Sequence, residues 1–233
     1  MHPLVRTARV TGAFYLGLAV TGGLGFLLIR GQLYVPSQPD ATLAHLTDHE
    51  SLARLGIAVE LGVVLTQALA AVWFYRLFRS VDTFAAGCLA AFGLVNAVAI
   101  LGSAALLATA LDVALDSTLA PAGDAAGTVQ LMYLVSGNLW EVGALFFGLW
   151  LVPMGWLVLR SGWMPRLLGW ILVGGGVGYV CSAFVGQLAP GADVITGALT
   201  LPATVGELWM VGYLLVGRLM RRILTSGFGR GPT

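Results

Sequence analysis

Six long, mostly apolar stretches constrain this chain more than any other feature of its sequence. They cover about 10–29, 55–75, 84–111, 130–159, 167–189 and 201–222. A helix of about 20 mostly apolar residues is long enough to cross the roughly 30 Å hydrocarbon core of a membrane. We therefore predict an all-α fold, a polytopic membrane bundle of six transmembrane helices that forms one integral membrane domain over residues 1–233.

Composition excludes several other classes of protein. Only 10% of the 233 residues are charged, and 58% are hydrophobic, whereas soluble domains carry about 25% charged residues. The net charge is +1 and the chain has no lysine, so neither a soluble enzyme, a disordered chain nor a nucleic-acid binder fits. Cys88 and Cys181 lie in separate apolar stretches, which gives no disulfide framework.

The arginines predict the orientation of the chain in the membrane. With six spans, only Arg30 and Arg54 lie on one side, and the others share the opposite side: Arg6, Arg9, Arg76, Arg79, Arg160, Arg166, Arg218, Arg221, Arg222 and Arg230. The positive-inside rule then places both termini in the cytoplasm. We expect a plasma-membrane protein whose first span is retained, with the lipid bilayer as its partner and a short helix over about 40–50 in the outer interface.

The outer loops suggest an internal repeat. Each loop contains a proline followed within a few residues by an aspartate, namely Pro36 and Asp40, Pro121 and Asp124, and Pro190 and Asp193. Each loop also precedes a span that carries one glutamate. This pattern predicts three helical hairpins of one kind. The hairpins would run parallel, without the inverted repeat of many carriers, so a homo-oligomer that supplies the second half remains open.

Small residues recur every four positions in two spans. Ala13, Gly17, Thr21 and Gly25 form one such stripe, and the fifth span has another at Gly174, Gly178, Ser182 and Gly186. Small residues at this spacing let helices approach closely in lipid. We interpret both stripes as helix-packing seams.

Three glutamates lie within apolar spans, namely Glu60, Glu141 and Glu207. An ionised side chain there costs about 2.5–3.5 kcal/mol or more, and such residues commonly mark substrate or proton paths. The spans place the three at similar depth, roughly 10 Å below the outer surface. The sequence offers no lysine, arginine or histidine within a span to neutralise them. Arg30 and Arg54 at the outer rim could reach down, but Arg54 is six residues from Glu60 and not on its helix face.

Polar and aromatic residues accompany these glutamates at helical spacing. The candidates for a shared cavity in the outer half of the membrane are Asn138, Asn96, Gln67, Gln187, Thr204, Trp140 and Trp209. Residues three, four or seven apart share a helix face, and the tryptophans suit a hydrophobic or cationic ligand. Alternatively, each glutamate is protonated and hydrogen-bonded, and merely holds helices together.

The sequence predicts no cofactor and no metal site. His45 and His49 stand four residues apart on the predicted interfacial helix, a spacing that could bind a metal, but a third ligand is lacking. No histidine lies in a span, so haem has no axial ligand there.

Several segments resemble a known bacterial family. They are Arg9–Leu16 (RVTGAFYL), Leu33–Pro36 (LYVP), Glu50–Gly56 (ESLARLG), Arg160–Gly169 (RSGWMPRLLG) and Pro202–Leu208 (PATVGEL). Over nearly its whole length the chain is similar to the family catalogued as domain of unknown function 4386. The resemblance implies an all-helical multi-pass membrane protein and brings no activity or site residues with it.

Three functions follow from these observations. The favoured one is a small-molecule binding or carrier protein whose protonatable glutamates line the cavity. The second is an intramembrane acid/base enzyme acting on a lipidic or isoprenoid substrate. The third is a structural or accessory subunit in which the polar groups only join helices.

Overall fold

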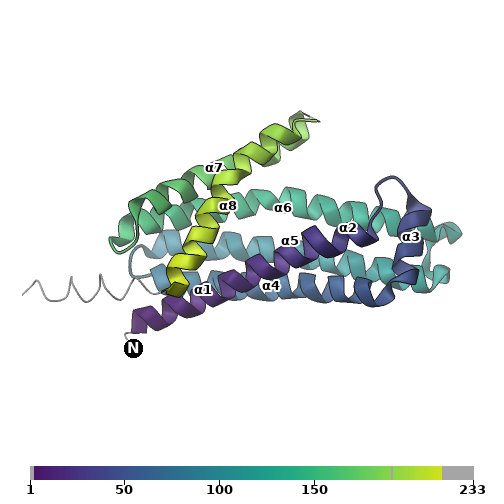
Figure 1. The fold of residues 1–233 in the computed structure, drawn as a ribbon, viewed down its shortest axis with the longest axis horizontal. Helices are drawn as coiled ribbons and strands as arrows, with labels where there is room; N and C mark the ends of the chain where they lie inside the picture. The colour runs from purple at the N-terminus through teal and green to yellow at the C-terminus, as the bar shows by residue number, and fades with distance from the viewer. Residues whose placement is uncertain (1–2, 190, 217–233) are drawn as a thin grey trace, which may run out of the picture. The chain divides into compact units, whose positions relative to one another are not determined.

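The computed structural model describes residues 3–189 and 191–216, and within them the chain is helical. Six helices are long and apolar enough to cross a membrane, which confirms the predicted all-α, multi-pass architecture (Figure 1). The elements are α1 (Pro3–Gly22), η1 (Gly23–Ile29), α2 (Arg30–Leu33), α3 (Pro39–Asp48), α4 (Glu50–Phe78), α5 (Thr83–Leu115), η2 (Ser117–Leu119), η3 (Pro121–Gly123), α6 (Ala125–Ser161), α7 (Arg166–Leu188) and α8 (Asp193–Val216). The hairpin repeat and the cytoplasmic termini stay predictions.

The first span is longer than its apolar stretch. It begins at Pro3 rather than at residue 10, because Val5 and Ala8 are buried and extend its packed face. A seven-residue π-helix, η1, carries the helix on into α2, which ends at Leu33 rather than at residue 29. The first span therefore includes Arg30, which the sequence pattern places at the start of a loop.

The last span begins eight residues before its predicted start at residue 201. Helix α8 starts at Asp193, which puts an acidic side chain in the first turn, where the helix dipole favours it. Pro202 consequently lies inside the helix and not in its first turn, an arrangement that membrane helices tolerate. The predicted end of this span, residues 217–222, lies outside the described residues.

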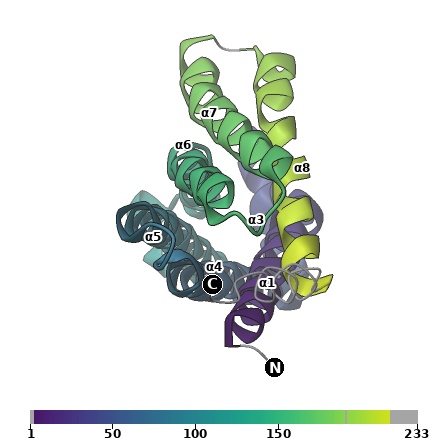
Figure 2. The ribbon, with the colours of Figure 1, turned by 90° about the vertical axis from the view of Figure 1, so that its left-hand side faces the viewer.

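Contacts divide the chain into two compact units. Unit 1 takes its described residues from Met1–Leu16, Gln67–Val95 and Ala144–Thr233, and unit 2 comprises Gly17–Thr66 and Asn96–Gly143. In unit 1, α7 and α8 pack on each other as a helical hairpin, and Figure 2 shows the two helices side by side.

In unit 2, α3 packs onto the ends of the long helices. Leu46 is fully buried and joins an apolar cluster with Leu33, Ala53 and Leu107. Thr42 anchors the helix through a 2.8 Å hydrogen bond to Gln130 Oε1. The predicted interfacial helix is thus an integral part of the unit 2 core.

Candidate functional site

Glu60 lies at the centre of a buried polar network in unit 2. Its side chain projects from α4 and the residue is 6% exposed. The hydroxyl of Ser103 on α5 donates to Glu60 Oε2 at 3.0 Å, and the indole N–H of Trp140 on α6 donates to Oε1 at 3.1 Å. Two donors from two other helices therefore converge on one carboxylate.

Arg30 brings a positive charge into the same network. Its side chain is 13% exposed, and its Nη1 lies 3.9 Å from Glu60 Oε1. Nη1 donates to Ser136 Oγ at 3.0 Å, and Nη2 donates to the carbonyl oxygen of Tyr133 at 2.7 Å. Arg30 therefore does approach Glu60, which is one of the alternatives that the sequence left open. The prediction that no basic group lies within a span is wrong for Arg30, because the first span continues through η1 to Leu33.

The two serines link the charged groups in a defined direction. Ser103 Oγ and Ser136 Oγ are 2.7 Å apart. Arginine can only donate, so Ser136 accepts from Arg30 and is left to donate its own proton to Ser103. Ser103 in turn donates to Glu60. The network thus runs from the cation through two hydroxyls to the anion.

A small cavity of about 20 Å³ adjoins this pair. A space of this size holds one water molecule. Three lining residues are polar, namely Arg30, Glu60 and Tyr133. The rest are apolar: Gly25, Ile29, Leu33, Ala53, Gly56, Ile57 and Leu107. Glu141 is not among them.

Two stacked tyrosine rings lie beside the guanidinium of Arg30. Tyr34 stacks on Tyr133 with ring centres 5.5 Å apart and planes 8° from parallel. The guanidinium carbon of Arg30 lies 6.0 Å from the centre of the Tyr34 ring and 5.7 Å from that of Tyr133. Rings at this distance stabilise a cation through their negative faces.

Local sequence explains why Arg30 and Glu60 meet. The predicted stripe on the first span packs against α4: a Cβ on Gly17 would lie 3.0 Å from Thr66, and one on Gly25 would lie 3.2 Å from Val59. The same seam pairs Thr21 with Gly62. Close approach of these helices, with the wider turn of the π-helix, brings Arg30 beside Glu60. Such π-helical segments are often found at functional sites.

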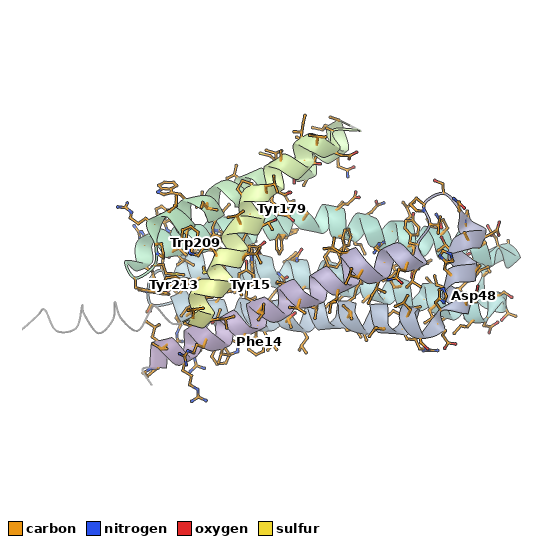
Figure 3. All side chains as sticks on the ribbon, viewed as in Figure 1. Phe14, Tyr15, Asp48, Tyr179, Trp209 and Tyr213 are labelled. Carbon is orange, nitrogen blue, oxygen red and sulfur yellow. The ribbon has the colours of Figure 1, made fainter. Side chains whose placement is uncertain are left out.

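Glu207 has different surroundings, in unit 1. It lies on α8, is half-buried, and accepts a hydrogen bond from the hydroxyl of Tyr15 on α1. Tyr15 is labelled in Figure 3. The Tyr15 ring packs edge-on against Phe74 at 5.2 Å and Trp150 at 5.7 Å between ring centres. The carboxyl group thus meets a neutral donor from an aromatic cluster.

The remaining predicted site residues differ in their exposure to solvent. Asn96 and Gln67 are buried, and neither polar atom of the Gln67 amide has a hydrogen-bond partner among the described residues. Trp209 is 36% exposed. The other candidates are exposed, namely Glu141, Asn138, Thr204 and Gln187. The structure therefore joins Glu60 with Trp140, and leaves Glu141 and Asn138 on an outward helix face.

Depth along the helices also differs among the three glutamates. Glu60 lies ten residues after Glu50, or about 15 Å into α4. Glu207 lies 14 residues after Asp193, about 21 Å into α8, and Glu141 lies 16 residues after Ala125, about 24 Å into α6. The later predicted start of the last span placed Glu207 nearer to the beginning of its helix, and the depth of the three glutamates in the membrane stays a prediction.

The histidines provide no complete ligand set. The ring centres of His45 and His49 are 6.3 Å apart, and the Nδ1 of His45 is buried without a hydrogen-bond partner in the part of the chain that the structure describes. Across residues 3–189 and 191–216, no three histidine, cysteine or acidic residues gather as metal ligands do.

Comparison with known proteins places the chain in a family. No curated protein and no solved structure matches the chain. A family model described as "Domain of unknown function" matches residues 10–217, which includes both units and every residue of the Glu60 network. The chain therefore belongs to the family DUF4386.

Proposed function

We propose that this chain binds and carries a small molecule at the Arg30–Glu60 site. The observation that carries the proposal is a buried ion pair beside a cavity in a membrane-spanning unit. Ionisable groups are expensive at such depth and commonly belong to substrate or proton paths. The cavity holds little more than a water molecule, so a larger ligand requires movement of η1 or α3.

Orientation in the membrane is the second part of the proposal. The arginine distribution favours a plasma-membrane protein with cytoplasmic termini, and the lack of lysine beside abundant arginine, alanine and glycine favours a bacterial source. In that orientation the Glu50 end of α4 faces outward, so Glu60, about 15 Å from that end, lies in the outer half of the membrane. A homo-oligomer would supply the second half of a carrier.

Native mass spectrometry of the protein in nanodiscs tests this function. We expect a bound small molecule in the wild type, its loss in Glu60→Gln, and its retention in Glu141→Gln. The second variant is a matched control, because Glu141 lies in a span but is exposed. Equal ligand occupancy in all three proteins would refute the proposal, as would the absence of ligand from the wild type after screening.

A second candidate function rests on the Tyr15–Glu207 contact. A half-buried carboxyl group hydrogen-bonded to a tyrosine within an aromatic cluster is suited to acid/base chemistry on a lipidic or isoprenoid substrate. A mass change in an added isoprenoid that is lost in Glu207→Gln and kept in Glu60→Gln would favour this enzyme over the carrier.

The third role, an accessory subunit, makes the opposite prediction. If the Glu60 network only joins helices, Glu60→Gln lowers the unfolding temperature while no ligand binding depends on it. Parallel thermal unfolding and binding measurements on the same variants separate the two functions.

A further inference from the structure

We infer that the ligand of the Arg30–Glu60 site is a monocarboxylate, a carboxyl group joined to apolar carbon, and that Arg30 holds the carboxylate. This inference rests on the proposed function and names its substrate class. It starts from the hydrogen bonds of the guanidinium, not from the glutamates that stand out in the sequence.

Arg30 lacks a close anionic partner. Within the described residues both of its hydrogen bonds go to uncharged acceptors, Ser136 Oγ and the Tyr133 carbonyl. A guanidinium has five N–H donors, and charge-assisted N–H to carboxylate bonds are usually about 2.7–2.9 Å long. The nearest approach to Glu60 is 3.9 Å. Three N–H groups of a mostly buried cation therefore have no hydrogen-bond acceptor among residues 3–189 and 191–216.

Glu60 does not supply the missing acceptor because its nearest oxygen, Oε1, lies 3.9 Å from Nη1 of Arg30, which is too far for a hydrogen bond. Oε1 accepts from Trp140 and Oε2 accepts from Ser103. Arg30 lines the cavity together with Glu60. A carboxylate in the cavity would therefore meet a guanidinium with spare donors, and the planar guanidinium matches a carboxylate in bidentate geometry.

The residues that line the cavity indicate which chemical groups can lie next to the carboxylate of the ligand. Seven of the ten lining residues are apolar or glycine. The volume of about 20 Å³ holds one water molecule, so entry of a carboxylate requires the same movement of η1 or α3 that the proposed function requires. Apolar carbon next to the carboxylate fits these walls better than further hydroxyl or amino groups, which would lack partners. Arg30 disfavours a cationic ligand, which would repel the guanidinium.

Binding of a carboxylate at this site is expected to include uptake of one proton, because of the charges already present there. The titratable or charged groups facing the site are Arg30 from α2, Glu60 from α4, Tyr133 from α6 and Tyr34 after α2, and the charge of the exposed Glu141 on α6 also acts on Arg30. Helix α5 contributes only Ser103 and Leu107, which are neutral. A second carboxylate beside Glu60 leaves two anions for one cation. Close carboxylates share a proton, so the ligand binds together with one proton and affinity rises as the pH falls.

Calorimetric titration of the full-length protein in nanodiscs tests this inference. The probes are butyrate, laurate, dodecyl phosphate, dodecanol and dodecyltrimethylammonium, each at pH 6 and pH 8. We expect tighter binding of the carboxylates than of the neutral and cationic probes, and tighter binding at pH 6. Butyrate and laurate distinguish a short water-soluble acid from a lipid-derived one, and dodecyl phosphate tests the alternative oxyanion.

Two arginine variants provide the matched comparison. Arg30→Lys keeps the charge and loses the planar fork, so we expect at least tenfold weaker carboxylate binding. Arg54→Lys changes an arginine of the same unit that is exposed and already bonded to Glu50 at 2.7 Å. The carboxylate affinity of this variant should therefore equal that of the wild type. Glu60→Gln should remove the difference between pH 6 and pH 8.

The inference and the proposed function fail in different ways. If dodecanol or the cationic probe binds as tightly as laurate, and depends on Glu60 but not on Arg30, the carboxylate assignment is wrong and the binding function stands. If no small molecule depends on Glu60, the proposed function itself fails. Should Arg30→Lys not fold, carboxyl-¹³C laurate with the wild type decides: a separate bound carboxyl resonance supports the inference, and a single bulk resonance overturns it.

Discussion

Glu60 and Glu207 are the same residue type on two membrane-spanning helices, yet the two units surround them differently. Glu60 in unit 2 is buried, accepts hydrogen bonds from a serine and a tryptophan, and lies 3.9 Å from a guanidinium. Glu207 in unit 1 is half-buried, and among the described residues it accepts one side-chain hydrogen bond, from the neutral hydroxyl of Tyr15. A counter-ion offsets part of the cost of burying a carboxylate in an apolar unit, whereas a single neutral donor supplies only a hydrogen bond.

Removing the counter-ion should have the largest effect. Arg30→Ala leaves a buried carboxylate unpaired and also frees two acceptors, Ser136 Oγ and the Tyr133 carbonyl. Breaking a buried ion pair costs about 3–5 kcal/mol of unfolding free energy. Arg54→Ala removes an exposed partner, and exposed pairs are worth about 0–1 kcal/mol. Denaturant unfolding in detergent measures both, and equal losses would mean that Arg30 is not buried in a functional pair.

The different surroundings of Glu60 and Glu207 could be predicted only in part from the sequence. Local hydropathy predicts six spans because each span depends only on its own residues. The Arg30–Glu60 pair depends on where the first span ends, and a π-helix that adds a turn after Gly22 is not readable from apolar composition. The available signal was the stripe of Gly17, Thr21 and Gly25, whose contact with α4 continues to Ile29, the residue before Arg30.

The sequence did not identify two residues of the Glu60 network, and it assigned two exposed residues to the site. Ser103 and Ser136 are small residues in apolar stretches, and nothing in their spacing distinguishes them from packing serines. Asn138 and Glu141 do share a helix face, as predicted, but that face is exposed. Periodicity shows which residues lie together on a helix and not which way the face points, because that depends on packing against other helices.

The glycine seams of the two units should also respond differently to substitution. In unit 1, a Cβ on Gly175 would lie 2.5 Å from the backbone nitrogen of Ala203, which cannot move aside. In unit 2, a Cβ on Gly25 would meet only a Val59 methyl group at 3.2 Å. Overpacking costs about 1–3 kcal/mol, so we expect Gly175→Ala to lower stability by that amount and Gly25→Ala by less.

Gly174 is the matched control for the unit 1 seam. It belongs to the predicted stripe, but it is exposed, and a Cβ there would have no atom within 4 Å, whereas Gly178 faces the backbone carbonyl of Leu199. Gly174→Ala should leave stability unchanged or raise it slightly, since alanine favours helix. A loss equal to that of Gly175→Ala in the same unfolding assay would contradict the assigned packing.

Substitutions at the Tyr15–Glu207 contact should have a smaller effect than the loss of Arg30. Tyr15→Phe removes the hydroxyl but keeps the ring on Phe74 and Trp150. Hydrogen bonds between membrane helices are worth about 0.6 kcal/mol on average and up to about 1.7. Glu207→Gln should cost less still, because an amide oxygen also accepts from Tyr15. A loss as large as that of Arg30→Ala would place a charged partner near Glu207.

Asp82, which lies between α4 and α5, gives the smallest expected effect and a reference for a carboxylate outside the spans. The backbone N–H of Ala85 donates to it at 3.1 Å and lowers the pKa of Asp82, and Arg160, 3.7 Å away, lowers it further. A lowered pKa stabilises the folded state above the unfolded value of about 3.9, and this contribution is lost as the pH falls through the lower folded pKa. Asp82→Asn keeps a capping side chain and loses only the charge. Its unfolding temperature should therefore lie slightly below that of the wild type at pH 7 and converge with it in acid. A difference that persists at low pH would assign the effect to packing and not to charge.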